Sequence, residues 1–240
     1  MALFKRLRFE LQLLRYIIPN IYFNFHYLPF LQALKLPIVF YKPHFGMLKG
    51  KVSIKTGGGE ITHGMIKLGF NGVVLYPNNG IRFQIAGGNV EFNGKCYIGS
   101  SSAIAVGRKG TLMLGDNFSS SAGIKIACQH RIKFGSNVLC GWEATFMDSD
   151  FHQLSSVDSS QPPQPFAPIV IGNGCWFGSK TLIMKGTKLP DNCTIATNSM
   201  CNKEYTGDYT IYAGAPAKAR KTGLYRDYKN DTINYPEINE

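Results

Sequence analysis

His152 is the residue of this chain whose type and position best suit acid–base chemistry. It ends the run Met-Asp-Ser-Asp-Phe-His, which begins at Met147 and lies where a regular repeat stops. An unperturbed imidazole has a pKa of about 6.5, so it can accept a proton near neutral pH. A nearby carboxylate from Asp148, Asp150 or Glu143 can hold the imidazole in one tautomer and stabilise its protonated form. Each of these carboxylates is equally suited to capping a turn.

A six-residue period from Ile171 to Cys201 indicates how such side chains are positioned. The first residue of each unit is apolar and the fifth is small. The first residues are Ile171, Phe177, Ile183, Leu189, Ile195 and Cys201, and the fifth are Cys175, Thr181, Thr187, Cys193 and Ser199. A helix returns every 3.6 residues and a plain strand every two, so neither explains a period of six. Three units, each a short strand and a turn, make a triangular coil of about 18 residues, with coils about 4.8 Å apart.

The same register continues upstream with longer steps. Its apolar or small first residues are Phe92, Ile98, Ile104, Leu114, Ser120, Ile126, Phe134, Cys140 and Phe146. The steps from Ile104 to Leu114 and from Ile126 to Phe134 exceed six residues, so we expect protruding corners there. Residues 50–90 are rich in glycine and β-branched residues, which favours irregular first coils. The sequence thus predicts a mainly β solenoid that buries one apolar residue per unit.

One interruption of the repeat follows His152 directly. Residues Gln153–Pro168 contain four prolines and four serines, and the period resumes at Ile169. Proline removes a backbone donor, so this segment does not fit in a strand ladder. We expect residues 153–168 to form a loop that projects from the solenoid. Long loops on rigid scaffolds often carry function.

The amino end differs in composition from the repeat. Residues 1–18 show helical spacing of leucine and isoleucine, and residues 1–55 carry nine lysines and arginines against one glutamate. The chain's net charge is +11, so most of the excess lies there. No apolar run reaches the roughly 18 residues of a membrane span, and no signal-peptide pattern is present. The segment is either a helical cap on the open end of the solenoid or a basic surface on anionic lipid. Its basic residues alternate with bulky aliphatic ones, which argues against nucleic-acid binding.

The six cysteines lack the close pairing of zinc or redox motifs. Cys175 and Cys193 are eighteen residues apart at the small position, and Cys140 and Cys201 occupy the first position. We expect these four to be small buried residues, with Cys175 stacked on Cys193. Free thiols of this kind indicate a reducing compartment, so we expect a cytoplasmic protein, with the inner face of the membrane as an alternative site.

The repeat, the run ending at His152 and two further segments resemble the hexapeptide-repeat acyltransferases. The two segments are Gly-Cys-Trp-Phe-Gly-Ser, residues 174–179, and Ile-Tyr-Ala-Gly-Ala-Pro-Ala-Lys, residues 211–218. The resemblance covers roughly residues 50–222 and is closest to the sugar O-acetyltransferases of bacterial capsule and polysaccharide gene clusters. It implies a left-handed parallel β-helix, a homotrimer with active sites between adjacent prisms, and a carbohydrate acceptor. It also implies acetyl-CoA as co-substrate, with no metal, although longer acyl groups are possible.

The resemblance also implies a role for individual residues. His152 is the expected general base for direct attack of a hydroxyl on the thioester, Glu143 the acceptor contact, and Asp148 or Asp150 the residue that orients His152. The expected coenzyme contacts are Trp176, Gly178, Ser179, Thr197, Asn202, Lys203, Lys218 and Lys221. Thr197, Asn202 and Pro190 depart from the usual Ala, Thr and Gly of the family, so individual donor contacts can differ here.

The predicted organisation is a basic, aromatic-rich helical extension at residues 1–48, a β-helix at 49–206 and a carboxyl-terminal segment with a polar tail at 207–240. Three alternatives to O-acetylation remain. An amino-sugar N-acetyltransferase uses the same scaffold with a different nucleophile. A zinc hydratase needs three converging histidines, whereas only His130 and His152 lie in the repeat. A non-catalytic scaffold needs neither the run ending at His152 nor the segment at 211–218.

Overall fold

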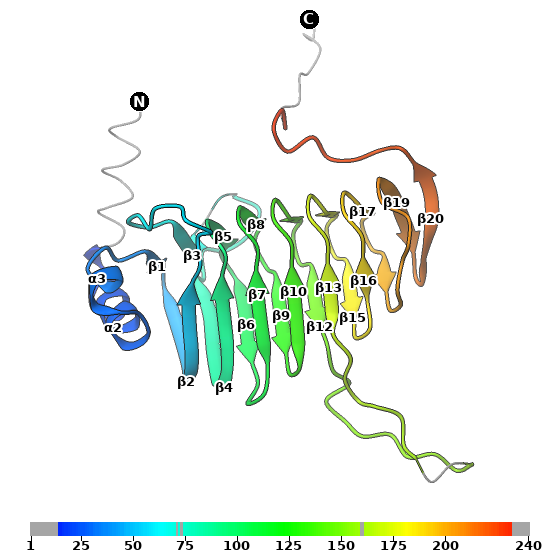
Figure 1. The fold of residues 1–240 in the computed structure, drawn as a ribbon, viewed down its shortest axis with the longest axis horizontal. Helices are drawn as coiled ribbons and strands as arrows, with labels where there is room; N and C mark the ends of the chain where they lie inside the picture. The colour runs from blue at the N-terminus through cyan, green and yellow to red at the C-terminus, as the bar shows by residue number, and fades with distance from the viewer. Residues whose placement is uncertain (1–13, 71, 73, 159–160, 232–240) are drawn as a thin grey trace, which may run out of the picture.

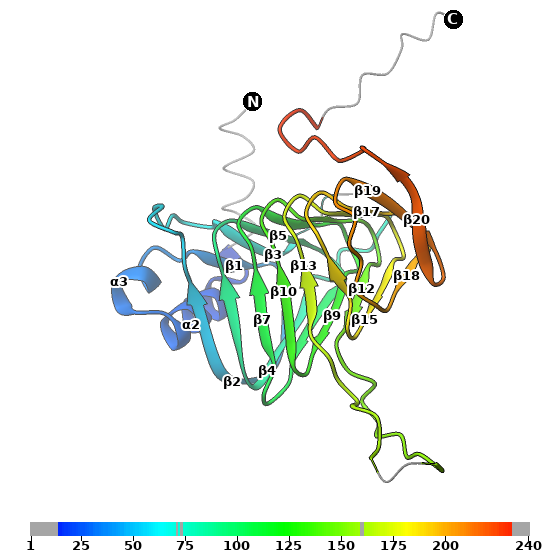
Figure 2. The ribbon, with the colours of Figure 1, turned by 45° about the vertical axis from the view of Figure 1, so that its right-hand side comes forward.

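The computed structural model describes residues 14–70, 72, 74–158 and 161–231. The strands wind into a triangular prism of stacked parallel coils, with two short helices against one end and an antiparallel strand at the other (Figures 1 and 2). The helices are α2 (Ile17–Tyr27) and α3 (Phe30–Ala33).

Three faces make up the prism. The first face contains β1 (Ile38–Phe40), β3 (Ile66–Phe70), β5 (Cys96–Gly99), β8 (Phe118–Ser120), β11 (Leu139–Cys140), β14 (Trp176–Phe177), β17 (Thr194–Ile195) and β19 (Thr210–Gly214). The second face contains β6 (Ser102–Val106), β9 (Lys125–Cys128), β12 (Thr145–Met147), β15 (Leu182–Met184) and β18 (Met200–Cys201). The third contains β7 (Thr111–Leu114), β10 (Arg131–Phe134), β13 (Ile169–Ile171) and β16 (Lys188–Leu189).

Two long strands, β2 (Pro43–Ile54) and β4 (Ile81–Phe92), belong to both the second and the third face. The first part of β4 pairs with β6 and its last part with β7, so the strand bends around a corner. Gly50 makes the bend of β2 possible, because its φ is +107° and a Cβ there would lie 2.2 Å from the carbonyl oxygen of Gly88. These continuous strands explain why residues 50–54 and 81–90 show no six-residue period.

The interior confirms the predicted register. Every first-position residue from Phe92 to Cys201 is buried, and the small fifth-position residues from Cys175 to Ser199 are buried as well. In the regular coils the strand partners are eighteen residues apart, as in Phe177 with Ile195 and Ile183 with Cys201. Phenylalanines stack edge to face along the axis, with ring centroids 4.8–5.1 Å apart from Phe134 through Phe146 to Phe177. Burial of these side chains supplies the main favourable free energy of folding.

The longer steps in the repeat fall on one corner of the prism. Residues 107–110, 129–130, 148–168 and 185–187 all join the second face to the third, and we call this ridge the His152 corner. The predicted protruding corners and the projecting loop are therefore confirmed, and the loop leaves the prism after β12 (Figure 1). The turns that join the first face to the second form a tighter ridge, which we call the Glu143 corner. In each coil one residue of this ridge has a left-handed backbone conformation, namely Ser101, Gly123, Glu143, Lys180 and Asn198.

Helix α2 covers the first coil through both apolar and polar contacts. Phe23 is fully buried, with its ring 4.7 Å from that of Phe40 and 5.5 Å from that of Phe83. The edge of β1 has no preceding coil to pair with, and two buried asparagines take its place. Asn24 Nδ2 donates to the Ile38 carbonyl at 2.7 Å, and the Ile38 N–H donates to Asn24 Oδ1 at 3.2 Å. Asn20 makes the same pair of hydrogen bonds with Phe40, at 3.2 and 2.7 Å.

The ends of the coil differ from the boundaries expected from sequence. The prediction of a helix over residues 1–18 lies mostly outside the described residues, and β1 begins at Ile38, before the expected boundary at 49. All three residues of β1 are buried, so they carry no alternation that would mark a strand. At the other end β19 continues the first face past residue 206 and then pairs antiparallel with β20 (Ala217–Thr222). Residues 232–240 of the expected tail lie outside the described part.

All six cysteines are free and buried. Cys175 and Cys193 lie in adjacent coils, where the Trp176 N–H donates to the Cys193 carbonyl at 2.8 Å. The prediction of small buried residues is therefore confirmed for these positions. Burial raises the pKa of the Cys201 thiol to about 11, so it stays protonated at neutral pH.

Replacement of Asn24 by Ala should destabilise the protein because it leaves the N–H and C=O of Ile38 buried without partners. We expect the free energy of unfolding to fall by about 2–4 kcal/mol, measured by denaturant titration followed by circular dichroism. The control is Gln32→Ala in α3, where less than about 0.5 kcal/mol should be lost. Equal losses in the two variants would show that the asparagine does not act as an edge partner.

Candidate functional site

His152 lies at the base of the projecting loop, five residues after β12 ends at Met147. Its side chain is exposed, and in the described part of the chain no hydrogen bond or ion pair holds the imidazole. The imidazole is thus free to meet a ligand or another subunit. Its position is set by the backbone on either side, which is anchored by the neighbouring carboxylates.

Asp148 is completely buried and caps the preceding turn of the His152 corner. Its carboxylate accepts the backbone N–H groups of Gln129 at 2.7 Å and His130 at 2.9 Å. Of the two roles open to this residue, the structure therefore shows the turn cap. Since no hydrogen bond joins Asp148 to His152, any effect on the imidazole passes through the backbone that Asp148 holds in place.

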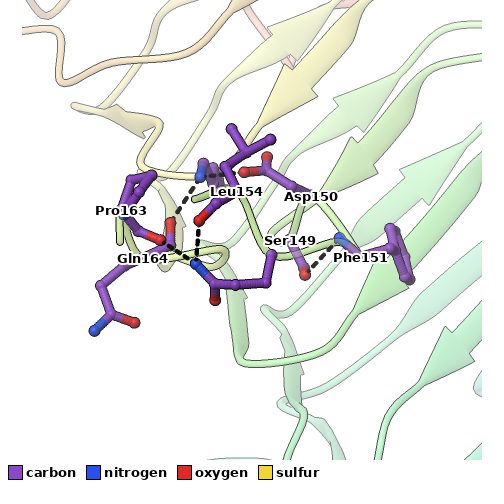
Figure 3. A network of polar contacts seen from close by, with 8 residues as sticks. Ser149, Asp150, Phe151, Leu154, Pro163 and Gln164 are labelled. Atoms are coloured by element: carbon purple, nitrogen blue, oxygen red, sulfur yellow. Dashed lines mark hydrogen bonds and ion pairs between the residues drawn. The ribbon is translucent and has the colours of Figure 1, made fainter. Parts of the chain in front are cut away.

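Asp150 holds the two ends of the projecting loop together through Lys185. The ammonium of Lys185 forms an ion pair with Asp150 and donates to the Gln164 carbonyl at 2.8 Å. Gln153 adds a bond across the loop, from Nε2 to the Pro163 carbonyl at 2.9 Å, and Figure 3 shows these contacts gathered at the loop base. Lys185 is the third residue of the repeat unit that begins at Ile183, and this contact explains why a long polar side chain occupies that position. Here too the carboxylate has a partner other than His152.

Glu143 occupies the other ridge, at the Glu143 corner, with a φ of 59°. Its Oε1 accepts a hydrogen bond from the Tyr76 hydroxyl at 3.0 Å. The Tyr76 ring stacks on Trp142 with centroids 6.3 Å apart. Desolvation raises the pKa of Tyr76, and the hydrogen bond to the Glu143 carboxylate raises it further. Nothing in the sequence signalled Tyr76, because it lies 67 residues from its partner.

The expected coenzyme residues divide between the same two corners. Gly178, Ser179 and Thr197 lie together on the Glu143 corner in adjacent coils, where the Asn198 N–H donates to the Ser179 carbonyl at 3.0 Å. A Cβ on Gly178 would lie 2.6 Å from the Thr197 nitrogen, so only glycine allows this approach of the coils. Trp176 is 40% exposed on the first face beside them and offers an apolar wall.

The remaining expected coenzyme residues lie elsewhere on the prism. Asn202 and Lys203 follow β18 at the His152 corner and are exposed, with the Lys203 ammonium 5.6 Å from the centroid of the Tyr205 ring. Lys218 and Lys221 are exposed on β20. Within one chain the structure therefore does not bring the expected donor residues into a single cluster. It also does not bring Glu143 and His152 together, because they lie on opposite edges of the second face.

The second face between the two corners is apolar in its later coils. Its outward residues there are small or hydrophobic and half-buried, namely Ala127, Thr145, Met147, Leu182, Met184 and Met200. The same face becomes basic toward the first coils, where Arg82 and Lys125 are exposed. Among the described residues no group of three His, Cys, Asp or Glu side chains lies close enough to hold a metal ion. No described helix is long and apolar enough to cross a membrane.

No protein-family model matches the chain. In sequence it is similar to acetyltransferases. It is 27% identical over 163 residues to a probable acetyltransferase of Mycobacterium tuberculosis, an alignment that covers 67% of this chain and 51% of that protein. It is 25% identical over 154 residues to the galactoside O-acetyltransferase of Escherichia coli, covering 61% and 71%. The chain thus spans about half the length of the mycobacterial relative.

Among solved structures the chain is similar to a polySia-specific acetyltransferase, with a TM-score of 0.53, 13% identity, and coverage of 83% of this chain and 92% of that one. At 13% identity, this similarity is evidence for a shared fold. It supports the left-handed parallel β-helix of the hexapeptide-repeat type. The resemblance to acetyltransferases is confirmed by the sequence relatives.

The Glu143 corner allows a test of what the Tyr76 hydrogen bond contributes. Lys180 adopts the same left-handed conformation one coil away, and asparagine tolerates it better than either residue. We expect Lys180→Asn to raise the free energy of unfolding by about 0.5–1 kcal/mol. The gain in the free energy of unfolding should be about 1 kcal/mol smaller for Glu143→Asn, because the shorter side chain no longer accepts the hydrogen bond from the Tyr76 hydroxyl.

The same pair of substitutions in a Tyr76→Phe background serves as the control, measured by denaturant unfolding. The difference between the two asparagine variants should then disappear. A difference that persists without the hydroxyl would mean that Glu143 is stabilised by something other than this bond.

Proposed function

We propose that this chain, a relative of the hexapeptide-repeat acetyltransferases, transfers an acetyl group from acetyl-CoA to a carbohydrate hydroxyl with His152 as general base. The observation that carries the proposal is the unpartnered, exposed imidazole of His152 at the junction of rigid coil and anchored loop. Of the relatives described above, one is named a probable acetyltransferase and the other a galactoside O-acetyltransferase. His152 takes the hydroxyl proton as the oxygen attacks the thioester carbonyl, and it returns that proton to the departing thiolate.

The proposed assembly is a trimer in which the apolar later coils of the second face lie toward the three-fold axis, while its basic early coils, with Arg82 and Lys125, stay open to solvent. In that arrangement the Glu143 corner of one prism meets the His152 corner of the next. Residues that lie apart in one chain, Glu143 with Gly178 on one ridge and His152 with Lys203 on the other, then line a single groove. The apolar later coils of the second face support this orientation, since half-buried Met147, Leu182 and Met184 would become buried.

Within the groove, Trp176 and the backbone of Gly178, Ser179 and Thr197 suit the pantetheine arm of the donor. Asn202 and the exposed ammonium groups of Lys203, Lys218 and Lys221 suit its phosphates. Glu143 is proposed to accept a hydrogen bond from the acceptor, with Tyr76 holding its carboxylate in place. Asp148 and Asp150 position His152 by fixing the backbone and the loop on which it lies.

His152→Ala should lower the rate of acetyl transfer by about 10²–10⁴-fold, the usual contribution of a general base, and leave the affinity for acetyl-CoA unchanged. The rate is measured as free coenzyme A released with a panel of sugars, and affinity by calorimetric titration. A Trp176→Ala, Lys203→Ala double variant should show the reverse pattern, with weakened donor binding. Near-normal turnover without His152 would refute its role, and a folded wild type that binds no acetyl-CoA would refute the acyltransferase proposal.

We also propose that the helical end rests on an anionic membrane surface. Helix α2 turns Asn20, Phe23 and Asn24 toward the prism and exposes apolar side chains on its other side. The exposed apolar residues of α2, α3 and their flanks are Leu14, Ile17, Ile18, Ile21, Tyr22, Phe25, Phe30, Leu31 and Leu34. Exposed Arg15, Lys49 and Lys51 add positive charge at this end. Apolar area beside basic residues is the combination that binds anionic lipid.

Sedimentation with vesicles tests this contact. The wild type should bind vesicles that contain phosphatidylglycerol more strongly than phosphatidylcholine vesicles, and Ile18→Ser with Leu31→Ser should reduce binding by at least about tenfold. The control is Leu224→Ser, an exposed leucine at the opposite end of the chain. Equal binding by the wild type and the double variant would contradict membrane contact through α2 and α3.

A further inference from the structure

A cavity of about 600 Å³ opens on the early part of the second face, away from the residues proposed for the donor. Its lining includes four basic side chains, Lys42, His44, Arg82 and Lys125, and contains no carboxylate. The remaining walls are small or polar, from Asn79 through Gly80 to Ser101, Ser102 and Ala103. A concave site in which several positively charged hydrogen-bond donors converge is suited to binding an anion.

The strand register explains how the cavity forms. Outward residues of consecutive strands follow one another along the face in the order His44, Arg82, Ala103, Lys125 and Thr145. Neighbouring strands are about 4.8 Å apart, so Arg82 and Lys125 flank Ala103 at a separation of about 10 Å. The small side chain of Ala103 leaves a hollow between two long cationic ones.

The cationic groups of this hollow are available to a ligand. Arg82, Lys125 and His44 have exposed side chains, and in the described residues no carboxylate pairs with any of them. Lys42 donates to the Asn78 carbonyl at 2.7 Å, which keeps its ammonium at the rim without neutralising its charge. Ser101 donates to the Pro77 carbonyl at 2.7 Å, and this contact fixes the segment that forms the other wall.

The hollow borders the residue proposed to contact the acceptor. Lys125 pairs in register with Thr145, two residues after Glu143, so the end of the cavity lies one coil from Glu143. The donor residues lie on the far side of that coil, toward β14, β17 and β20. An acceptor that reaches Glu143 from the early coils therefore passes over Arg82 and Lys125.

We infer that the acceptor is an acidic carbohydrate and that Arg82 and Lys125, with His44 and Lys42, bind its oxyanion. This inference rests on the proposed function for the identity of the ligand as acceptor. The shared chemistry is a carboxylate or phosphate oxygen pair, which the guanidinium of Arg82 can bind in a bidentate manner. Carboxylate of an acidic sugar and phosphate of a sugar phosphate are the two sources to be distinguished.

Binding of three probes to the full-length protein tests the site, namely trigalacturonic acid, inorganic phosphate and neutral maltotriose, each by titration at two salt concentrations. We expect at least one anion to bind, more weakly at high salt, and maltotriose to bind least. Arg82→Gln with Lys125→Gln should weaken anion binding by at least about tenfold. The anion preferred by the wild type identifies the source.

The matched control is Arg131→Gln with Lys133→Gln. Both residues are exposed on β10 of the third face, and their replacement removes the same amount of positive charge. It should leave anion affinity within about twofold, since these side chains point away from the cavity. Ala103→Glu is a second test, because it places a carboxylate in the hollow without removing a cation. Like Arg82→Gln with Lys125→Gln, it should weaken anion binding by at least about tenfold.

Three results would overturn the inference: no anion binding by the wild type, equal losses in the two double variants, or unchanged binding in Ala103→Glu. Titration of the same samples with acetyl-CoA separates this outcome from failure of the proposed function. If all variants bind acetyl-CoA equally and the wild type binds no anion, the acidic acceptor is refuted and the proposed function is not. If the wild type binds an anion but no acetyl-CoA, the acetyltransferase proposal is refuted and the anion site at Arg82 and Lys125 is retained.

Discussion

The backbone hydrogen bonds between successive coils are the constraint on which the rest of this structure depends. Each strand of an internal coil pairs in register with strands of the neighbouring coils, so the positions of corners, interior side chains and outward side chains are copied along the axis. The residue at this position of the Glu143 corner consequently has a left-handed backbone conformation, whether it is Ser101, Glu143 or Lys180. The proposed general base, His152, lies where this copying is interrupted, at the corner from which residues 148–168 leave the prism.

The same constraint explains why the candidate site is divided. Parallel coils place residues in rows along ridges, and a row can hold a binding surface for a long ligand but cannot bring opposite edges of one face together. Glu143 and His152 therefore stay at opposite edges of the second face within one chain. Carboxylates that look catalytic in sequence instead stabilise the interruption, with Asp148 on the backbone of residues 129–130 and Asp150 on Lys185.

The six-residue period was sufficient to predict the interior from Phe92 to Cys201, because each unit must bury one apolar residue and turn at one small one. It failed for the first coils, where β2 and β4 run through a corner and the bend depends on Gly50 rather than on a repeat. The roles of Asp148 and Asp150 were not separable in sequence, since a turn cap and a catalytic carboxylate require the same residue types. The Tyr76–Glu143 contact depends on how a long segment lies across the ridge, which local spacing does not encode.

The pairing of Asn20 and Asn24 with β1 has a consequence for the association of whole molecules. A bare first coil would present a flat row of backbone donors and acceptors, on which a coil of another chain could template itself. Side-chain amides occupy that row, and they offer no further strand edge behind them. Growth of the stack along β1 is therefore blocked at this end, and a second chain could pair only along the outer edge of β2, for which the described residues show no partner strand besides β4.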